Sequence, residues 1–244
     1  MGPPLTHVPL AVRRVRCRRS VAAGAGRAGP RTEADMARTQ RAEAMRALVR
    51  GPGGAVRVLG AVCLVVALVW RGPVDVALFS LVLAGLVVPL AAAAPRRLDA
   101  AYGLGLVAAA WCGALQLYQA VAWLDVVAHL VVTGLVAAVA YLLLQRRTGV
   151  VVDAGTVTTG AARLGVVAVT AALGCALSVL WEVGEYLGNT YVDPEIYVGY
   201  ADTVGDLVAG GIGSAVAGVW LTARRRPRAV AGASTTPRDE PAAT

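Results

Sequence analysis

The chain has 244 residues, of which 57% are hydrophobic and only 16% are charged, and its mean hydropathy is +0.63. A soluble domain has about a quarter of its residues charged, so this composition predicts an all-α, polytopic integral membrane protein and disfavours a soluble enzyme. The formal net charge is +8, but the excess lies in the first part of the chain and at helix ends, so we expect no nucleic-acid partner.

The two ends of the chain differ in composition from its middle. Residues 1–53 form a basic, low-complexity segment rich in Arg, Ala, Gly and Pro, which we expect to be disordered. It is either a basic tail near anionic lipid or a stretch preceding a true translation start at Met36 or Met45. Residues 227–244, rich in Pro, Thr and Ala, predict a second disordered tail. Residues 54–226 are then the transmembrane domain.

Within that domain, apolar runs alternate with short polar breaks and predict about six transmembrane helices. The runs cover approximately residues 56–70, 74–94, 98–117, 124–145, 161–188 and 201–223. The first is short, and the sequence suggests that Arg57 lengthens it by extending its head group toward water.

Arginine placement predicts the orientation of these spans. With the N-terminus inside, the only arginine at an outer helix end is Arg71. The inner ends hold Arg46, Arg50, Arg57, Arg96, Arg97, Arg146, Arg147, Arg163, Arg224, Arg225, Arg226 and Arg228. This asymmetry follows the positive-inside rule and predicts that both termini are cytoplasmic.

Acidic residues gather at the opposite ends of the last three spans. Five carboxylates and one imidazole lie at similar depth, paired on helix faces by spacings of three or four residues. The pairs are Asp125 with His129, Glu182 with Glu185, and Asp202 with Asp206. Because no arginine other than Arg71 is expected nearby, these acids need a bound cation, shared protons, or hydrogen bonds from Gln116, Gln119, Tyr118 and Tyr186.

Carboxylates with one imidazole suit a hard or borderline divalent metal. We therefore predict a metal site with ligands Asp125, His129, Glu182 and Asp206. Glu185 or Asp202 would act as the general base of a metal-assisted reaction.

Three runs in this region also resemble a known family. They are Leu124-Asp125-Val126-Val127-Ala128-His129, Trp181-Glu182-Val183-Gly184-Glu185 and Asp202-Thr203-Val204-Gly205-Asp206-Leu207. They resemble the YjdF-type bacterial inner-membrane proteins and, more distantly, the VanZ-like family, over residues 118–220. The resemblance implies a location in the bacterial inner membrane. The VanZ-like group, which is associated with reduced sensitivity to a glycopeptide antibiotic, also suggests envelope or lipid-linked chemistry. Gly210 stands near where that group has Asn, and Glu185 stands where Gln is common, which favours the YjdF-type resemblance.

Three classes of function fit these observations. The first is a metal-assisted hydrolase or transferase whose partners are membrane lipid and a lipid-linked envelope substrate. The second is a proton- or cation-coupled transporter, although the acids lie near one end of the spans rather than at the midplane. The third is a non-enzymatic membrane scaffold.

Overall fold

The computed structural model describes residues 48–224, and within that range the chain is helical, with no β-strand. This confirms the predicted all-α membrane fold. The tails expected at residues 1–53 and 227–244 lie largely or wholly outside the described residues. The elements are α2 (Gly51–Trp70), α3 (Pro73–Gly85), α4 (Val88–Ala91), α5 (Arg96–Ala114), α6 (Leu117–Ala120), α7 (Ala122–Ala128), a π-helical turn (His129–Thr133), α8 (Gly134–Thr148), α9 (Gly160–Tyr191) and α10 (Tyr200–Ala223).

Five segments of the described chain, rather than six, are long and apolar enough to cross a membrane. They are Gly51–Trp70, Pro73–Ala91, Trp123–Thr148, Gly160–Tyr191 and Tyr200–Ala223. The segment expected as the third span corresponds to α5, which is not among them. Its first turn carries Arg96, Arg97 and Asp99, and these charges lower its mean hydropathy.

Two of the expected spans are interrupted. The second is divided into α3 and α4, with Pro89 in the first turn of α4, where a missing backbone N–H is tolerated. The fourth contains the π-helical turn between α7 and α8. Hydropathy alone reads both as continuous helices because it does not report the backbone hydrogen-bond pattern.

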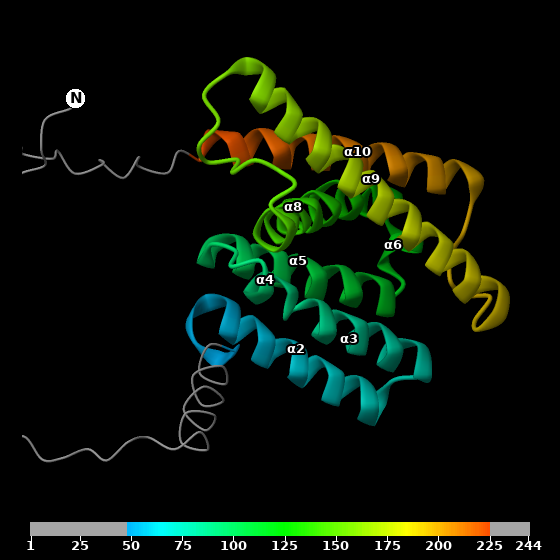
Figure 1. The fold of residues 1–244 in the computed structure, drawn as a ribbon. Helices are drawn as coiled ribbons and strands as arrows, with labels where there is room; N and C mark the ends of the chain where they lie inside the picture. Colours follow the sequence, from blue (N-terminus) through cyan, green and yellow to red (C-terminus); the bar gives the residue numbers. More distant parts are fainter. Residues whose placement is uncertain (1–47, 225–244) are drawn as a thin grey trace, which may run out of the picture. The chain divides into compact units, whose positions relative to one another are not determined.

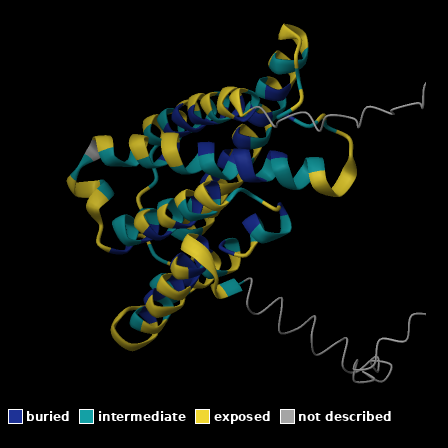
Figure 2. Cartoon of the chain, turned by 90° about the vertical axis from the view of Figure 1, so that its left-hand side faces the viewer, coloured by how far each residue is buried: buried dark blue, intermediate teal, exposed yellow. Residues whose placement is uncertain are grey.

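The helices form two neighbouring groups, as Figure 1 shows. In the first, α2, α3 and α5 pack around apolar residues that include Val56, Phe79 and Val107. In the second, α8, α9 and α10 contact one another, and α5 joins the groups by contacting α8. Figure 2 shows buried residues on the facing sides of the helices and exposed ones on the outer sides. Many exposed side chains are large and apolar, such as Leu68 and Leu180, as expected for surfaces that face lipid.

Arg57 does not extend toward water, so that expectation was wrong. Its residue surface is only 6% exposed. Its guanidinium donates from Nε to the Leu86 carbonyl oxygen at 2.8 Å and from Nη2 to Asp99 Oδ1 at 2.5 Å. Gly53 permits this approach, since a Cβ there would overlap the Asp99 carboxylate. The pair therefore ties α2 to α5 inside the first helix group.

We expect Asp99→Ala to destabilise the fold strongly, by about 3–5 kcal/mol, because it leaves the Arg57 charge buried without its partner. Removing both groups, as Arg57→Met with Asp99→Ala, should cost less than the single change. Thermal unfolding of the detergent-purified proteins measures both effects. A double variant as unstable as Asp99→Ala would show that the loss does not come from the orphaned charge.

Candidate metal centre

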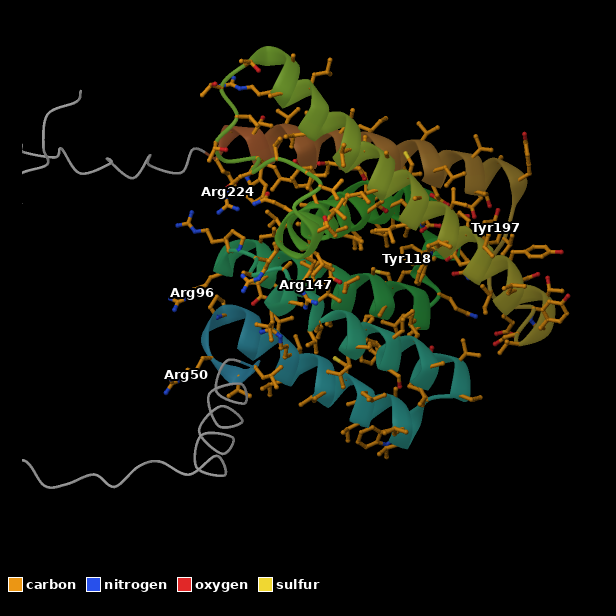
Figure 3. The ribbon with its side chains drawn as sticks, in the orientation of Figure 1. Arg50, Arg96, Tyr118, Arg147, Tyr197 and Arg224 are labelled. Carbon is orange, nitrogen blue, oxygen red and sulfur yellow. The ribbon has the colours of Figure 1, made fainter. Side chains whose placement is uncertain are left out.

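The ionisable residues identified from sequence lie away from the arginine-rich end of the helices. In Figure 3, Arg50, Arg96 and Arg224 lie at one end of the helices, and Tyr197 lies toward the opposite end. Asp125 lies in the first turn of α7 and Asp202 in the first turn of α10. Both helices therefore point their positive N-terminal ends toward this region, which favours carboxylates there.

His129 occupies the first position of the π-helical turn. Such turns add a residue to a helical repeat and are frequent at functional sites. Helix α10 packs directly on this turn, because Gly213 carries no side chain: a Cβ at Gly213 would overlap the Leu130 carbonyl oxygen. Gly134 likewise leaves space for the backbone of Gly213. Since Asp206 lies two helical turns before Gly213 on the same face, this close approach brings Asp206 beside His129.

Three carboxylates surround the imidazole of His129. Its Nε2 lies 3.6 Å from Asp125 Oδ1 and 3.9 Å from Asp206 Oδ2. Its Nδ1 lies 3.9 Å from Glu182 Oε1. These separations are longer than a hydrogen bond, for which the donor and acceptor atoms are at most about 3.2 Å apart. Two atoms that each lie about 2.1 Å from a tetrahedral ion are roughly 3.4 Å apart, so the spacing is close to what a shared cation requires.

Two groups of ligand atoms are close enough to hold a metal ion. One contains Asp125, His129 and Asp206, and the other contains His129, Glu182 and Glu185; in each, the ligand atoms lie within 4.8 Å of one another. His129 belongs to both. The structure thus brings together five of the six residues selected from sequence. Asp202 belongs to neither group and is partly exposed, one turn before Asp206.

The centre of this cluster is buried. His129, Glu182 and Asp206 are 8%, 9% and 2% exposed. Glu182 Oε1, the atom that faces the imidazole, is inaccessible to solvent and has no hydrogen-bond partner. A buried carboxylate oxygen without a partner is costly, because it has lost its hydration and gained nothing in return. Because it lies 3.9 Å from His129 Nδ1, a proton or a cation bound near this atom would lower that cost.

Arginine does not neutralise the cluster. Within residues 48–224, no arginine forms a salt bridge to Asp125, Glu182 or Asp206, and the basic side chain that lies within 4 Å of them is His129. Arg71, the arginine expected at this end, bonds instead to Asp75 at 2.6 Å and to the Ala114 carbonyl oxygen. The buried carboxylates therefore outnumber the single imidazole that contacts them.

The hydrogen bonds expected from Gln116 and Tyr118 to the acids do not form. Gln116 Nε2 donates to Glu195 Oε2 at 3.2 Å, and Tyr118 donates to the Ala109 carbonyl oxygen at 3.0 Å. Burial raises the pKa of Tyr118, so its phenol remains neutral and keeps this bond. Gln116 and Tyr118 are therefore not donors to the carboxylates of this cluster.

The residues that set the spacing of the helices at the site were not evident from the sequence. The π-helical turn and the contact between Gly134 and Gly213 set the distance from α10 to His129. A usable signal was present: Asp206, Gly210 and Gly213 share one face of α10.

The model of a family described as "Predicted membrane protein (DUF2238)" matches residues 55–227, most of the chain. No curated protein and no solved structure matches. The matched segment contains every residue of the cluster around His129.

Proposed function

This chain belongs to the DUF2238 family of predicted membrane proteins, and we propose that its cluster around His129 binds a divalent cation and supports hydrolysis or group transfer on a lipid-linked substrate. The observation that carries the proposal is a buried imidazole whose Nε2 is approached by the carboxylates of Asp125 and Asp206, while its Nδ1 faces Glu182. A cation on the Nε2 side would offset the negative charges of Asp125 and Asp206 in a low-dielectric environment.

The distances favour different roles for the four residues that we expected to be ligands. Asp125 and Asp206 both approach Nε2 of His129, and these three residues are the proposed ligands. Glu182 faces the other ring nitrogen of His129, Nδ1, at 3.9 Å. A carboxylate there is the usual partner of a metal-bound histidine, because it fixes the ring orientation and strengthens the opposite nitrogen as a ligand. Glu182 is thus proposed to orient His129.

The proposed chemistry needs an acid–base group beside the cation. A divalent cation supplies a Lewis acid and lowers the pKa of bound water. Glu185 lies in the second group of ligand atoms around His129, and Asp202 lies one turn before Asp206, so both are candidates to accept or deliver a proton. The absence of an arginine salt bridge to the cluster within residues 48–224 disfavours a phosphatase, which would need to bind phosphate oxygens.

The location of the cluster supports a lipid-linked substrate. Exposed aromatic residues, Trp123, Trp181 and Tyr186, lie on the same helices within a few residues of the cluster. Tryptophan and tyrosine concentrate where hydrocarbon meets head groups. A substrate with a polar group at that depth and an acyl or isoprenoid chain in the bilayer would reach the site without leaving the membrane.

We expect Glu182→Gln to weaken divalent-metal binding by about 10- to 100-fold without removing it, since the amide keeps its size but loses the charge that supports His129. Metal titration of the purified chain with Mn²⁺ and with Zn²⁺ measures this. Glu195→Gln is the matched control, because Glu195 is an exposed acid at the same end that bonds to Gln116. An equal loss in the control would mean that general surface charge, not this site, holds the metal.

Enzyme and transporter make different predictions for the same variants. Nanodiscs containing bacterial envelope lipids, incubated with the chain and Mn²⁺, should show a lipid product by mass spectrometry that Asp206→Asn abolishes. Cation or proton flux into vesicles, lost in Asp206→Asn without any lipid product, would replace the enzyme with a transporter. If the chain binds metal but shows neither a lipid product nor flux, the metal has a structural role.

We also propose that the chain lies in the bacterial inner membrane with both termini cytoplasmic. The resemblance to YjdF-type proteins and the grouping of Arg50, Arg96 and Arg224 at one end support this. An alkaline phosphatase fused after Thr244 should then be inactive, and a fluorescent protein fused there should be bright. The reverse pattern would invert the orientation and place the metal site on the cytoplasmic side.

A further inference from the structure

A second polar feature lies at the arginine-rich end of the helices. A cavity of about 300 Å³ opens there between the ends of α4, α8 and α10, beside the connection from α8 to α9. Its lining is Ala92, Ala93, Pro95, Leu142, Gln145, Arg146, Asp153, Ala154, Gly155, Leu221 and Arg224. None of these residues belongs to the cluster around His129.

Two guanidinium groups face this cavity. Arg146 lies in the last turn of α8 and Arg224 follows α10, and both are exposed. Within residues 48–224 neither forms a salt bridge. The Arg224 guanidinium stacks on the Trp220 ring, 4.5 Å from its centroid, which limits its rotamers. An arginine held in place in this way loses less entropy when it binds an anion.

The acidic residue in the lining, Asp153, takes part in a hydrogen bond within the connection from α8 to α9. Asp153 Oδ1 accepts a hydrogen bond from the Gly155 amide at 3.0 Å. With two arginines and this one aspartate, the formal charge of the lining is +1 (2 − 1). The side chains of Leu142 and Leu221 supply an apolar wall on the helices that flank the cavity. The site therefore combines a single excess positive charge with an apolar side.

We propose that this cavity binds the phosphate of an anionic phospholipid, with Arg146 and Arg224 as its donors. A phosphodiester carries one negative charge, which matches the lining, and guanidinium groups bind phosphate oxygens with charge-assisted hydrogen bonds. Basic pockets between membrane helices are known sites for anionic head groups. The apolar wall accounts for a lipid rather than a soluble phosphate, because it accommodates the glycerol and first acyl carbons.

The test uses the full-length chain in detergent, titrated with short-chain phosphatidylglycerol and followed by native mass spectrometry. We expect Arg146→Gln with Arg224→Gln to weaken binding by at least about tenfold. Arg147→Gln is the matched control for Arg146→Gln alone, because it removes the same charge from the same helix end but lies outside the lining. Arg146→Gln alone leaves the stacking of Arg224 on Trp220 intact and serves if the double variant fails to fold.

Three results would overturn the proposal. An equal loss in Arg147→Gln would assign binding to the general surface charge of this end. Phosphatidylcholine binding as tight as phosphatidylglycerol would show that the anionic head group is not selected. Inorganic phosphate competing at the same concentration as the lipid would make the cavity a site for soluble anions. Selective phosphatidylglycerol binding, lost only with the lining arginines, would support it.

Discussion

Replacing His129 with alanine should remove divalent-metal binding from the purified chain. The imidazole is the shared member of both groups of ligand atoms, with Nε2 toward Asp125 and Asp206 and Nδ1 toward Glu182. Its loss deletes one ligand and also disconnects Glu182 from the metal. Since changing a supporting carboxylate alone costs about 10- to 100-fold, we expect affinity to fall by more than about a hundredfold.

Elemental analysis and thermal unfolding give two independent readouts of this change. Wild-type protein should contain near-stoichiometric metal and should be stabilised by added Mn²⁺ or Zn²⁺, by about 2.7 kcal/mol at a hundredfold excess over Kd. The His129→Ala protein should show neither effect. His7→Ala is the matched control, because His7 is the other histidine of the chain. Metal retained at wild-type stoichiometry in His129→Ala would refute the proposed site.

The sequence was sufficient for the membrane fold and for most members of the cluster. Hydrophobic runs of membrane-spanning length are a strong signal, and they locate five spans in the described chain. Helical spacing also placed Asp125 with His129, and Glu182 with Glu185, on shared faces. These are local properties, which a sequence expresses directly. The positions of the arginines at the ends of the apolar runs likewise predicted that Arg50, Arg96 and Arg224 group at one end of the helices.

The features that sequence did not yield depend on contacts between distant segments. The partners Arg57 and Asp99 are 42 residues apart in the sequence. Sequence alone therefore suggested that the Arg57 guanidinium reaches water, whereas it is buried and paired with Asp99. The π-helical turn is a change of backbone hydrogen bonding that leaves hydropathy unaltered. Asp202 shares a face with Asp206 but joins neither group of ligand atoms, because the approach of the helices, not spacing alone, decides which carboxylates meet.

Changing Gly213 to alanine should disrupt the site without altering any ionisable residue. The added methyl group would overlap the Leu130 carbonyl oxygen, a backbone atom that cannot rotate away. Helix α10 must then move from the π-helical turn, and Asp206, two turns earlier on the same face, moves with it. Overpacking of this kind costs about 1–3 kcal/mol, although alanine is intrinsically the better helix former by about 1 kcal/mol.

Gly205→Ala separates this contact from the general effect of replacing a helical glycine. Gly205 is on the same helix, next to Asp206, and a Cβ there meets no atom within 4 Å. We expect Gly205→Ala to keep metal affinity and to be as stable as wild type or more so, whereas Gly213→Ala loses both stability and metal affinity. If Gly213→Ala is destabilised yet binds metal as tightly as wild type, then the contact between Gly213 and Leu130 does not set the position of Asp206. The ligands would have to be sought instead around Glu182 and Glu185, on the Nδ1 side of His129.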